Sequence, residues 1–261
     1  MERKYAGTTA RSSPEPQRRL SVHLARGAAE VLEAQRLRYR VFAEEMGARL
    51  PSAEEGIDSD PFDAWCEHLI VTEEDTGEVV GTYRILTGET AKRVGGFYSD
   101  QEFDLTRLNH LRDRAVEIGR SCVHPDHRSG IVIALLWSGL ADYMLRTGYE
   151  YILGCASLSM VDGGHSAAAA FIKLRETHLS PVEYRVFPRC PLPLHELDQH
   201  VAPTIAPLIR AYLRVGAYVC GEPAWDPDFN TADLLMLLPA SRVDARYAKH
   251  FIARHLVRNG G

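Results

Sequence analysis

The chain has 261 residues, of which 45% are hydrophobic and 25% are charged, values that are usual for a globular protein and unlike those of a disordered or rod-like one. At this length it can bury a substantial core as one elaborated domain. Its formal net charge of −5 argues against a general nucleic-acid binder, because such proteins carry a clear cationic excess. We therefore expect no nucleic-acid partner.

Cysteine usage and the start of the chain indicate the compartment. The five cysteines are widely spaced and form neither a CxxC pair nor a metal-ligand pattern, which suits a reducing cytoplasm. The N-terminus has no apolar signal region, and no stretch reaches the roughly 18 apolar residues that a spanning helix needs. We expect a cytoplasmic protein, and peripheral contact with the inner face of the membrane stays open.

In chain order, residues 1–19 come first, and their polar, basic, proline-containing sequence predicts a disordered tail. Residues 20–261 are expected to form a single domain. The apolar spacing after Glu30 predicts a helix that ends near Gly47. An acidic, loop-like segment over residues 48–61 follows it.

The middle of the chain alternates between strand and helix patterns. Residues 66–73 and 78–86 are β-rich runs joined by the turn-forming EDTGE, which predicts a hairpin. A loop over residues 87–111 and a strand over residues 114–123 come next. Beyond them we expect a helix at 131–145, a strand at 149–157, helices at 167–176 and 203–216, and a strand at 231–239.

The turn from His124 to Gly130, between the strand and the helix, has the features of an anion site. The N-terminus of a helix presents free N–H groups that can hold a phosphate. Arg128 adds positive charge, and Gly130 permits close approach. A plain connection is the alternative, because one glycine and one arginine in such a turn are common. The turn is therefore a candidate site for a pyrophosphate or for the phosphate of phosphopantetheine.

A strand that ends in valine and leads into this turn resembles the GNAT superfamily, whose acyl-thioester loop reads Arg, two residues, Gly, one residue, then Gly or Ala. In the stretch Arg128-Ser-Gly-Ile-Val-Ile133 the first glycine lies one place early and the second is absent. Because this loop departs from the family pattern, it stays open whether the acyl donor is carried by a carrier protein or by free CoA. The resemblance implies an α+β fold with a mixed central sheet flanked by helices on both faces.

The same resemblance implies an acyl-phosphopantetheine thioester as donor substrate, on acyl carrier protein or CoA, and no tightly bound cofactor. The residues that would hold this donor are Cys122, Val123, His127, Arg128, Ser129 and Gly130. A backbone N–H near Cys122 or Val123 would stabilise the oxyanion. The Cys122 thiol has no histidine partner before it on the strand, so we interpret it as structural and not as a nucleophile.

Glu117, on the strand before the turn, is placed like the general-base glutamate of histone-type GNAT enzymes. A carboxylate there can take a proton from an ammonium nucleophile. Taken alone, a glutamate on a strand is more often solvated or salt-bridged. The GNAT pattern around Glu117 favours the catalytic interpretation.

A series of charged residues resembles the acyl-homoserine-lactone synthases, a GNAT branch that takes acyl groups from acyl carrier protein. The matching positions, in order, are Arg38 and Phe42, Asp60 and Asp63, Arg84, and Glu117 with Arg120. The resemblance implies that the first five bind substrate and that the last two are catalytic. The alternative is a structural ion-pair network that clamps the N-terminal part onto the sheet, because unpaired buried arginines are costly.

The block LRVGAYVCGEPAWDPDFNTAD, residues 213–233, resembles a more specific branch, the ornithine N-acyltransferases of ornithine-lipid synthesis. EIGRSCVHPDHR followed by ALLW is also similar, so the resemblance covers residues 30–240. It implies transfer of a 3-hydroxyacyl chain from acyl carrier protein to the α-amine of ornithine, giving a lyso-ornithine lipid. Asp226, Asp228 and Asp233 are candidate partners for the ammonium groups of the acceptor, with loop geometry as the alternative.

The implied partners are acyl carrier protein and ornithine. An acidic carrier is expected to dock near Lys92, Arg93, Arg112, Arg114 and Arg128. No metal site is expected, because His68, His124 and His127 lack metal-like spacing. Two rivals remain. One is an N-acyl amino acid synthase, a lactone synthase or a small-chain acetyltransferase. The other is a non-catalytic module that binds a carrier protein or a membrane surface.

Overall fold

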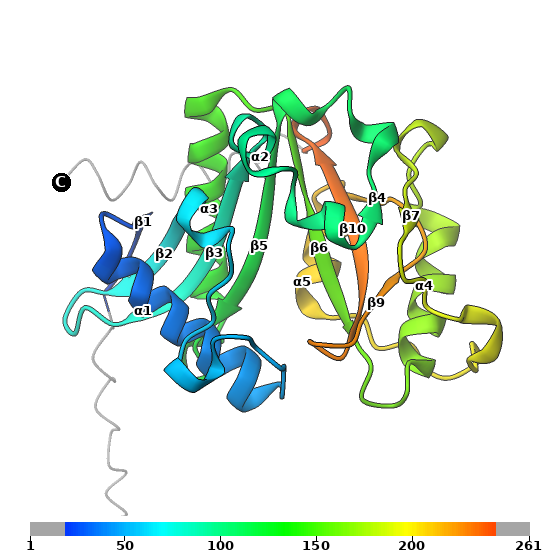
Figure 1. Ribbon diagram of the computed structural model, residues 1–261, viewed down its shortest axis with the longest axis horizontal. Helices are drawn as coiled ribbons and strands as arrows, with labels where there is room; N and C mark the ends of the chain where they lie inside the picture. The colour runs from blue at the N-terminus through cyan, green and yellow to red at the C-terminus, as the bar shows by residue number, and fades with distance from the viewer. Residues whose placement is uncertain (1–18, 244–261) are drawn as a thin grey trace, which may run out of the picture.

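The computed structural model describes residues 19–243, and an eight-stranded mixed sheet forms the centre of this part of the chain (Figure 1). The strand order is β1-β2-β3-β5-β6-β10-β8, with β9 paired to β10. The strands are β1 (Leu20–Leu24), β2 (Glu67–Glu73), β3 (Val79–Thr87), β5 (Ala115–Val123), β6 (Tyr151–Ser159), β8 (Tyr218–Val219), β9 (Ala224–Asp226) and β10 (Thr231–Pro239). Apart from Arg19, the predicted tail over residues 1–19 lies outside the described residues.

Helices cover both faces of this sheet. Leu69 and Val71 of β2 pack with α3, whereas Ile70 between them packs with α1. Because successive side chains of a strand point to opposite faces, α1 and α3 lie on opposite sides of the sheet. The α+β fold with helices on both faces is thereby confirmed. The helices are α1 (Ala28–Tyr39), α2 (Gly88–Val94), α3 (Ile131–Thr147), α4 (His165–His178) and α5 (Pro207–Arg214).

The predicted hairpin and first helix are confirmed. β2 and β3 pair antiparallel, and Gly77 in their connection has a φ of +74°. α1 continues into a π-helical turn, Arg40–Glu45, and the helical segment ends before Gly47, whose φ is +76°. Positive φ is accessible to glycine without steric cost, which explains both breaks. Among the described residues, no helix is both long enough and apolar enough to cross a membrane.

Two sequence predictions differ from the structure. The loop predicted over residues 87–111 is wrong where α2 forms, because the Thr87 side chain accepts a hydrogen bond from the Thr90 N–H and so caps a short polar helix. The same region also holds β4 (Phe103–Asp104), which pairs with β7 (Phe187–Pro188) in a separate two-stranded sheet. The helix predicted over residues 203–216 starts late, at Pro207, in the first turn where proline fits without loss of a hydrogen bond.

β5 and β6 are parallel neighbours that pair over only three positions, from Ala115 opposite Tyr151 to Glu117 opposite Leu153. A Cβ built on Gly154 would lie 2.2 Å from the Ile118 carbonyl oxygen, so the two strands touch closely where the pairing stops. Beyond that point the strands diverge, and the space between them becomes the cleft described below. β5 also carries a bulge, because Arg120, with a φ of +49°, is extra relative to β3.

Candidate active site

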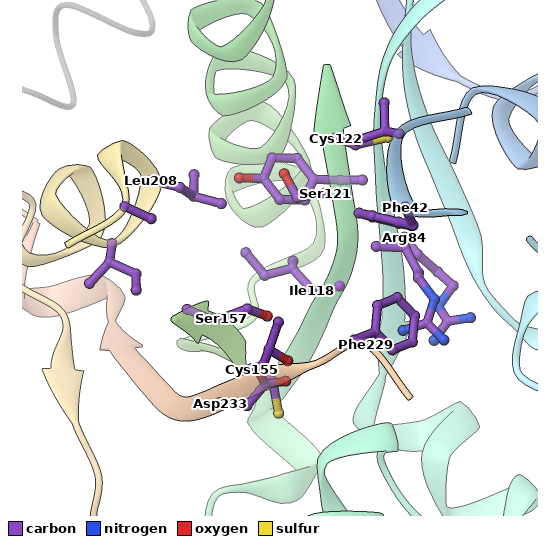
Figure 2. Close-up of a pocket in the computed structure, with 18 of the residues that line it drawn as sticks. Phe42, Arg84, Ile118, Ser121, Cys122, Cys155, Ser157, Leu208, Phe229 and Asp233 are labelled. Atoms are coloured by element: carbon purple, nitrogen blue, oxygen red, sulfur yellow. The ribbon is translucent and has the colours of Figure 1, made fainter. Parts of the chain in front are cut away.

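A cleft of about 450 Å³ fills the opening between β5 and β6 (Figure 2). We call it the central cleft. Its walls come from β5, β6, β10, α5 and the π-helical turn after α1. An apolar cavity of about 210 Å³ lies on its α3 and α5 side and shares Ile118, Cys155 and Tyr212 with it. The central cleft therefore has an apolar extension.

The predicted site residues divide into two groups by position. Those that line the central cleft are Phe42, Arg84, Glu117, Arg120, Cys122, Val123, Arg128, Asp226 and Asp233. Those outside its lining are Arg38, Asp60, Asp63, His127, Ser129, Gly130 and Asp228. Positions on β5 and β10 are thus brought together, whereas most of the aspartates before β2 lie behind the cleft wall.

Glu117 lies at the closed end of the cleft, where β5 and β6 separate, and its carboxylate is held from one side. Oε2 accepts a hydrogen bond from the Tyr98 N–H at 2.6 Å. Oε1 accepts two, from the Ser99 N–H at 2.8 Å and the Ser99 hydroxyl at 2.5 Å. Burial raises the pKa of Glu117, although the hydrogen bonds from Ser99 and Tyr98 oppose this shift. The carboxylate is fixed in position, and Oε2 retains capacity for a further donor.

Behind the cleft wall, three arginines and three aspartates form a buried ion-pair network. Arg38 is fully buried, donates to Asp58 from Nε at 2.8 Å, and binds both oxygens of Asp63 at 2.9 and 2.6 Å. Arg84 donates to Asp60 at 2.6 Å and to Asp63 at 3.3 Å. Although burial opposes it, the Arg38 guanidinium holds the pKa of Asp63 well below its usual range. Arg38, Asp60 and Asp63 are therefore engaged in ion pairs, and none of them lines the central cleft.

Arg120 joins this network to the cleft. Its guanidinium lies 3.1 Å from Asp58 and 3.1 Å from Asp60, and it is stacked between the rings of Tyr98 and Phe229, 4.9 and 4.8 Å from their centroids. The positive φ of Arg120 at the bulge directs the side chain into this sandwich. Asp58, which sequence analysis missed, precedes the Asp-x-x-Asp match by two residues and completes the charge balance.

The turn before α3, where a phosphate site is expected, has free N–H groups but an engaged arginine. Gly130 has a φ of +94°, and no side chain caps the helix, so the first-turn N–H groups are left for another acceptor. Arg128 makes a bidentate ion pair with Glu45 at 2.6 and 2.7 Å. A phosphate that recruits this guanidinium must therefore compete with Glu45.

The backbone of β5 favours one of the two expected oxyanion donors. The His124 N–H donates to the Val80 carbonyl of β3 at 2.9 Å. Successive N–H groups of an antiparallel strand alternate in direction, so the N–H of Val123 points away from β3, toward the opening beside β6. Burial raises the pKa of the Cys122 thiol to about 12, which keeps it protonated and fits the structural interpretation.

The three C-terminal aspartates have different surroundings. Asp226 Oδ1 accepts hydrogen bonds from the Asp228 and Phe229 N–H groups at 2.9 and 3.1 Å and so shapes the turn after β9. Asp228 is exposed and pairs with Arg49. Asp233 is only 5% exposed and lies beside Cys155, as Figure 2 shows. Loop geometry therefore accounts for Asp226 and Asp228 but leaves Asp233 without an explanation.

The network gives a prediction about stability. Arg38→Met should lower the free energy of unfolding by about 3–5 kcal/mol, because Asp58, Asp60 and Asp63 would then share only Arg84 and Arg120, which leaves one buried negative charge unbalanced. Arg49→Met, which removes the exposed pair with Asp228, is the matched control and should change it by less than about 1 kcal/mol. Urea denaturation measures both. Because the folded-state pKa of Asp63 is depressed, its contribution is present above its unfolded pKa, and the cost of Arg38→Met should shrink below about pH 4. Equal effects of the two variants would contradict this account.

Comparisons with known proteins agree with this geometry. The acetyltransferase (GNAT) domain model matches residues 37–138. The fold resembles that of FeeM, an N-acyl amino acid synthase from uncultured soil microbes, with a TM-score of 0.52, 13% identity, and coverage of 86% of this chain and 93% of that one. It also resembles MesI, a CoA-dependent acyl-homoserine lactone synthase, with a TM-score of 0.50, 12% identity, and coverage of 90% and 95%. At these identities the likeness shows the fold alone.

A closer similarity is to an L-ornithine Nα-acyltransferase of Rhodobacter capsulatus. It is 39% identical over 247 residues, which cover 89% of this chain and 95% of that protein. The resemblance, the fold class and the class of enzyme expected from the sequence are confirmed. The chain belongs to the L-ornithine Nα-acyltransferase family and is an N-acyltransferase with the GNAT fold.

Proposed function

We propose that the protein transfers a 3-hydroxyacyl group from the phosphopantetheine thioester of acyl carrier protein to the α-amine of ornithine, at the cytoplasmic face of the membrane. The products are an N-acyl ornithine, which is a lyso-ornithine lipid, and the free thiol of the carrier. Family membership supports the acceptor. The observation that carries the proposal is the shape and lining of the central cleft, which joins a phosphate-type turn, an apolar cavity and buried carboxylates.

The apolar cavity supports a long acyl group over an acetyl group. Its wall is built mainly from α3 and β6, and includes Trp137, Leu140, Met144 and Ile152. Hydrocarbon that leaves water for such a cavity contributes roughly 0.8 kcal/mol for each methylene. An acetyl donor would leave the cavity empty, so the small-chain rival gives no account of it.

We assign the proton transfer to Glu117. Its carboxylate takes a proton from the α-ammonium of ornithine, directly or through water, and the neutral amine attacks the thioester carbonyl. The Val123 N–H stabilises the negative oxygen of the tetrahedral intermediate. When the intermediate collapses, the carbon–sulfur bond breaks, and the leaving thiolate takes up the proton that the attacking nitrogen loses, which gives the amide and the free thiol. No covalent enzyme intermediate is needed, which fits the protonated state of Cys122.

The basic residues expected to dock the carrier lie at two ends of the sheet and do not form a single patch. Arg114 precedes β5 and Arg128 follows it, so the nine residues of the strand separate them by roughly 30 Å. Lys92, Arg112 and Arg114 are also paired, with Asp113, Asp100 and Glu150. The Arg128 end adjoins the phosphate-type turn, and we therefore propose that the carrier docks there.

The overall proposal predicts a change in the lipids of a host that makes none of this class. Expression of the chain should produce N-acyl ornithine, because the host supplies both acyl carrier protein thioesters and ornithine. Mass spectrometry of the lipid extract identifies the acyl chain and the amino acid together. Accumulation of a different N-acyl amino acid, or of an N-acetyl compound, would contradict the assignment of acceptor or donor.

The base assignment predicts the effect of Glu117→Gln. The turnover number should fall by roughly 10² to 10⁴, because the amide takes no proton from the ammonium. In the unmodified enzyme the turnover number should fall as the pH drops through the raised pKa of Glu117, since only the ionised carboxylate acts as a base. Glu183→Gln, at an exposed site, is the control. An unchanged rate at neutral pH would remove Glu117 from the mechanism, and a large drop in Tm would favour a structural role.

The donor assignment predicts a preference between thioesters. Acyl carrier protein should give a higher kcat/KM than the matching acyl-CoA, because the carrier adds contacts around the Arg128 end of the cleft. That advantage should diminish as salt screens the charges. Steady-state kinetics with both donors at two ionic strengths measures it. Equal kcat/KM for the two donors would contradict a carrier-specific enzyme.

A further inference from the structure

Two carboxylates meet between the central cleft and a neighbouring polar cavity of about 350 Å³, which we call the side cavity. Asp233 lines the central cleft, and Glu102, which follows the turn at Tyr98–Gln101, lines the side cavity. The ligand atoms of Glu102, Asp233 and Cys155 all lie within 4.8 Å of one another. Asp226 lines both cavities, so the region between them is strongly acidic.

These carboxylates have no positive partner in the part of the chain that the structure describes. Both oxygens of Glu102 and Oδ1 of Asp233 are shielded from solvent, and no described donor meets them in good hydrogen-bond geometry. The polar groups around them, Cys155, Ser157 and Thr231, are all uncharged. Arg120, which lines both cavities, is paired with Asp58 and Asp60. Burial, together with the negative charge of neighbouring carboxylates, raises the pKa of Glu102, and burial raises that of Asp233.

Burying two adjacent carboxylates without a bound cation lowers the stability of the protein. An isolated buried carboxylate loses several kcal/mol of solvation, and two adjacent ones also repel each other. The neighbouring arginine–aspartate network is balanced, because it contains three cations and three anions. The unbalanced pair therefore fits a cation that is supplied from outside.

The position of the pair relates it to Glu117. The Ser99 hydroxyl donates to Glu117 Oε1 at 2.5 Å and lies 3.3 Å from the Cys155 sulfur, which in turn adjoins both carboxylates. Glu117 and the pair are thus connected by three successive contacts, with only Ser99 and Cys155 between them. A small molecule with an amine at each end can present one amine to Glu117 and the other to the pair.

We propose that Glu102 and Asp233 together bind the distal ammonium of the acceptor amino acid and so select a diamino acid over a monoamino acid. A primary ammonium offers three N–H donors, and the pair offers three unpaired carboxylate oxygens. A neutral side chain leaves those oxygens unpaired and is rejected, because a site built for a hydrogen-bonding group discriminates strongly against analogues that lack it. This inference rests on the proposed function, since it concerns the acceptor of the same reaction.

The test compares ornithine with norvaline, which has the same carbon chain without the distal amine, and with lysine, which is longer by one methylene. A single acyl carrier protein thioester serves as donor throughout. The unmodified enzyme should prefer ornithine over norvaline by about 10²-fold or more in kcat/KM and should penalise lysine less.

Glu102→Gln and Asp233→Asn should raise the KM for ornithine by about 10- to 100-fold with little change in kcat, and should leave the kinetics with norvaline unchanged. Glu222→Gln, exposed and outside both cavities, is the matched control.

Two further measurements exclude other roles for the pair. Thermal unfolding should show that both variants are about as stable as the unmodified protein, because each replaces a carboxyl group that has no cationic partner among the described residues with an amide of nearly the same shape. Elemental analysis of the purified protein should find no stoichiometric metal. A bound divalent metal that is lost in Asp233→Asn would overturn the proposal.

The kinetic outcomes separate this inference from the proposed function. If the enzyme uses ornithine but both variants keep the ornithine-to-norvaline ratio, or lose kcat equally with both acceptors, the carboxylate pair does not recognise the distal ammonium. If the unmodified enzyme does not acylate ornithine, the proposed function fails first, whatever the variants do.

Discussion

The structure depends on the short contact between β5 and β6. These parallel strands pair over three positions and then diverge. Because Gly154 has no side chain, β6 can lie against the Ile118 carbonyl of β5 at the point of divergence. A fully paired sheet would satisfy these backbone groups with one another and leave no cleft. Because β5 and β6 part instead, the Val123 N–H is directed into open space and Glu117 lies at the apex of the cleft. The divergence of the two strands therefore determines where the Val123 N–H and the Glu117 side chain lie.

An open sheet needs reinforcement, and the buried arginine–aspartate network supplies it on one side. Arg38 comes from α1, Arg84 from β3 and Arg120 from the bulge of β5, while the three aspartates come from the segment before β2. The network thus ties the first helix and its following loop to the diverging strand. Such a network orients groups more surely than it stabilises them, because desolvation offsets much of the Coulomb gain. Its consequence is the fixed position of Arg120, which in turn holds Tyr98 and Phe229 at the mouth of the cleft.

The sequence predicted the elements around the cleft well but not the pairings among charged residues. Hydrophobic periodicity located the β2–β3 hairpin, β5, α3 and β10, because each has a continuous apolar core face. β1 and α2 were missed, since the first is only five residues long and the second is stabilised by a cap and not by an apolar stripe. The motif residues lie close together in the structure, yet nothing in a motif predicts that Arg84 lines the cleft whereas Arg38, in the same ion-pair network, does not.

Residues that sequence reasoning missed share a physical reason. Glu102 lies in a segment without regular periodicity, and Glu45 meets Arg128 from 83 residues away. Both residues matter because of the residues that they contact in the fold. Those partners are far away in the sequence, and the pattern of a single sequence does not predict such long-range contacts. Of the missed residues, Asp58 would have been the easiest to predict from the sequence. Three buried arginines require three anions, and the adjacent motif contains only two aspartates.

The two charge clusters beside the cleft follow one rule with different outcomes. A low-dielectric region tolerates charge only when the opposite charge is close. Around Arg120 the protein carries both signs in its own sequence, and the result is a rigid wall. Around Asp233 the described residues supply carboxylates but no cation that pairs with them. In the proposed reaction the ammonium of the acceptor supplies that cation, so acceptor binding depends on charge as well as shape. The apolar cavity that faces α3 would bind the acyl chain by burial alone. The same cleft can therefore hold a cationic amino acid and a hydrocarbon chain without either entering the other's site, which is the arrangement that an amine attacking a lipid thioester requires.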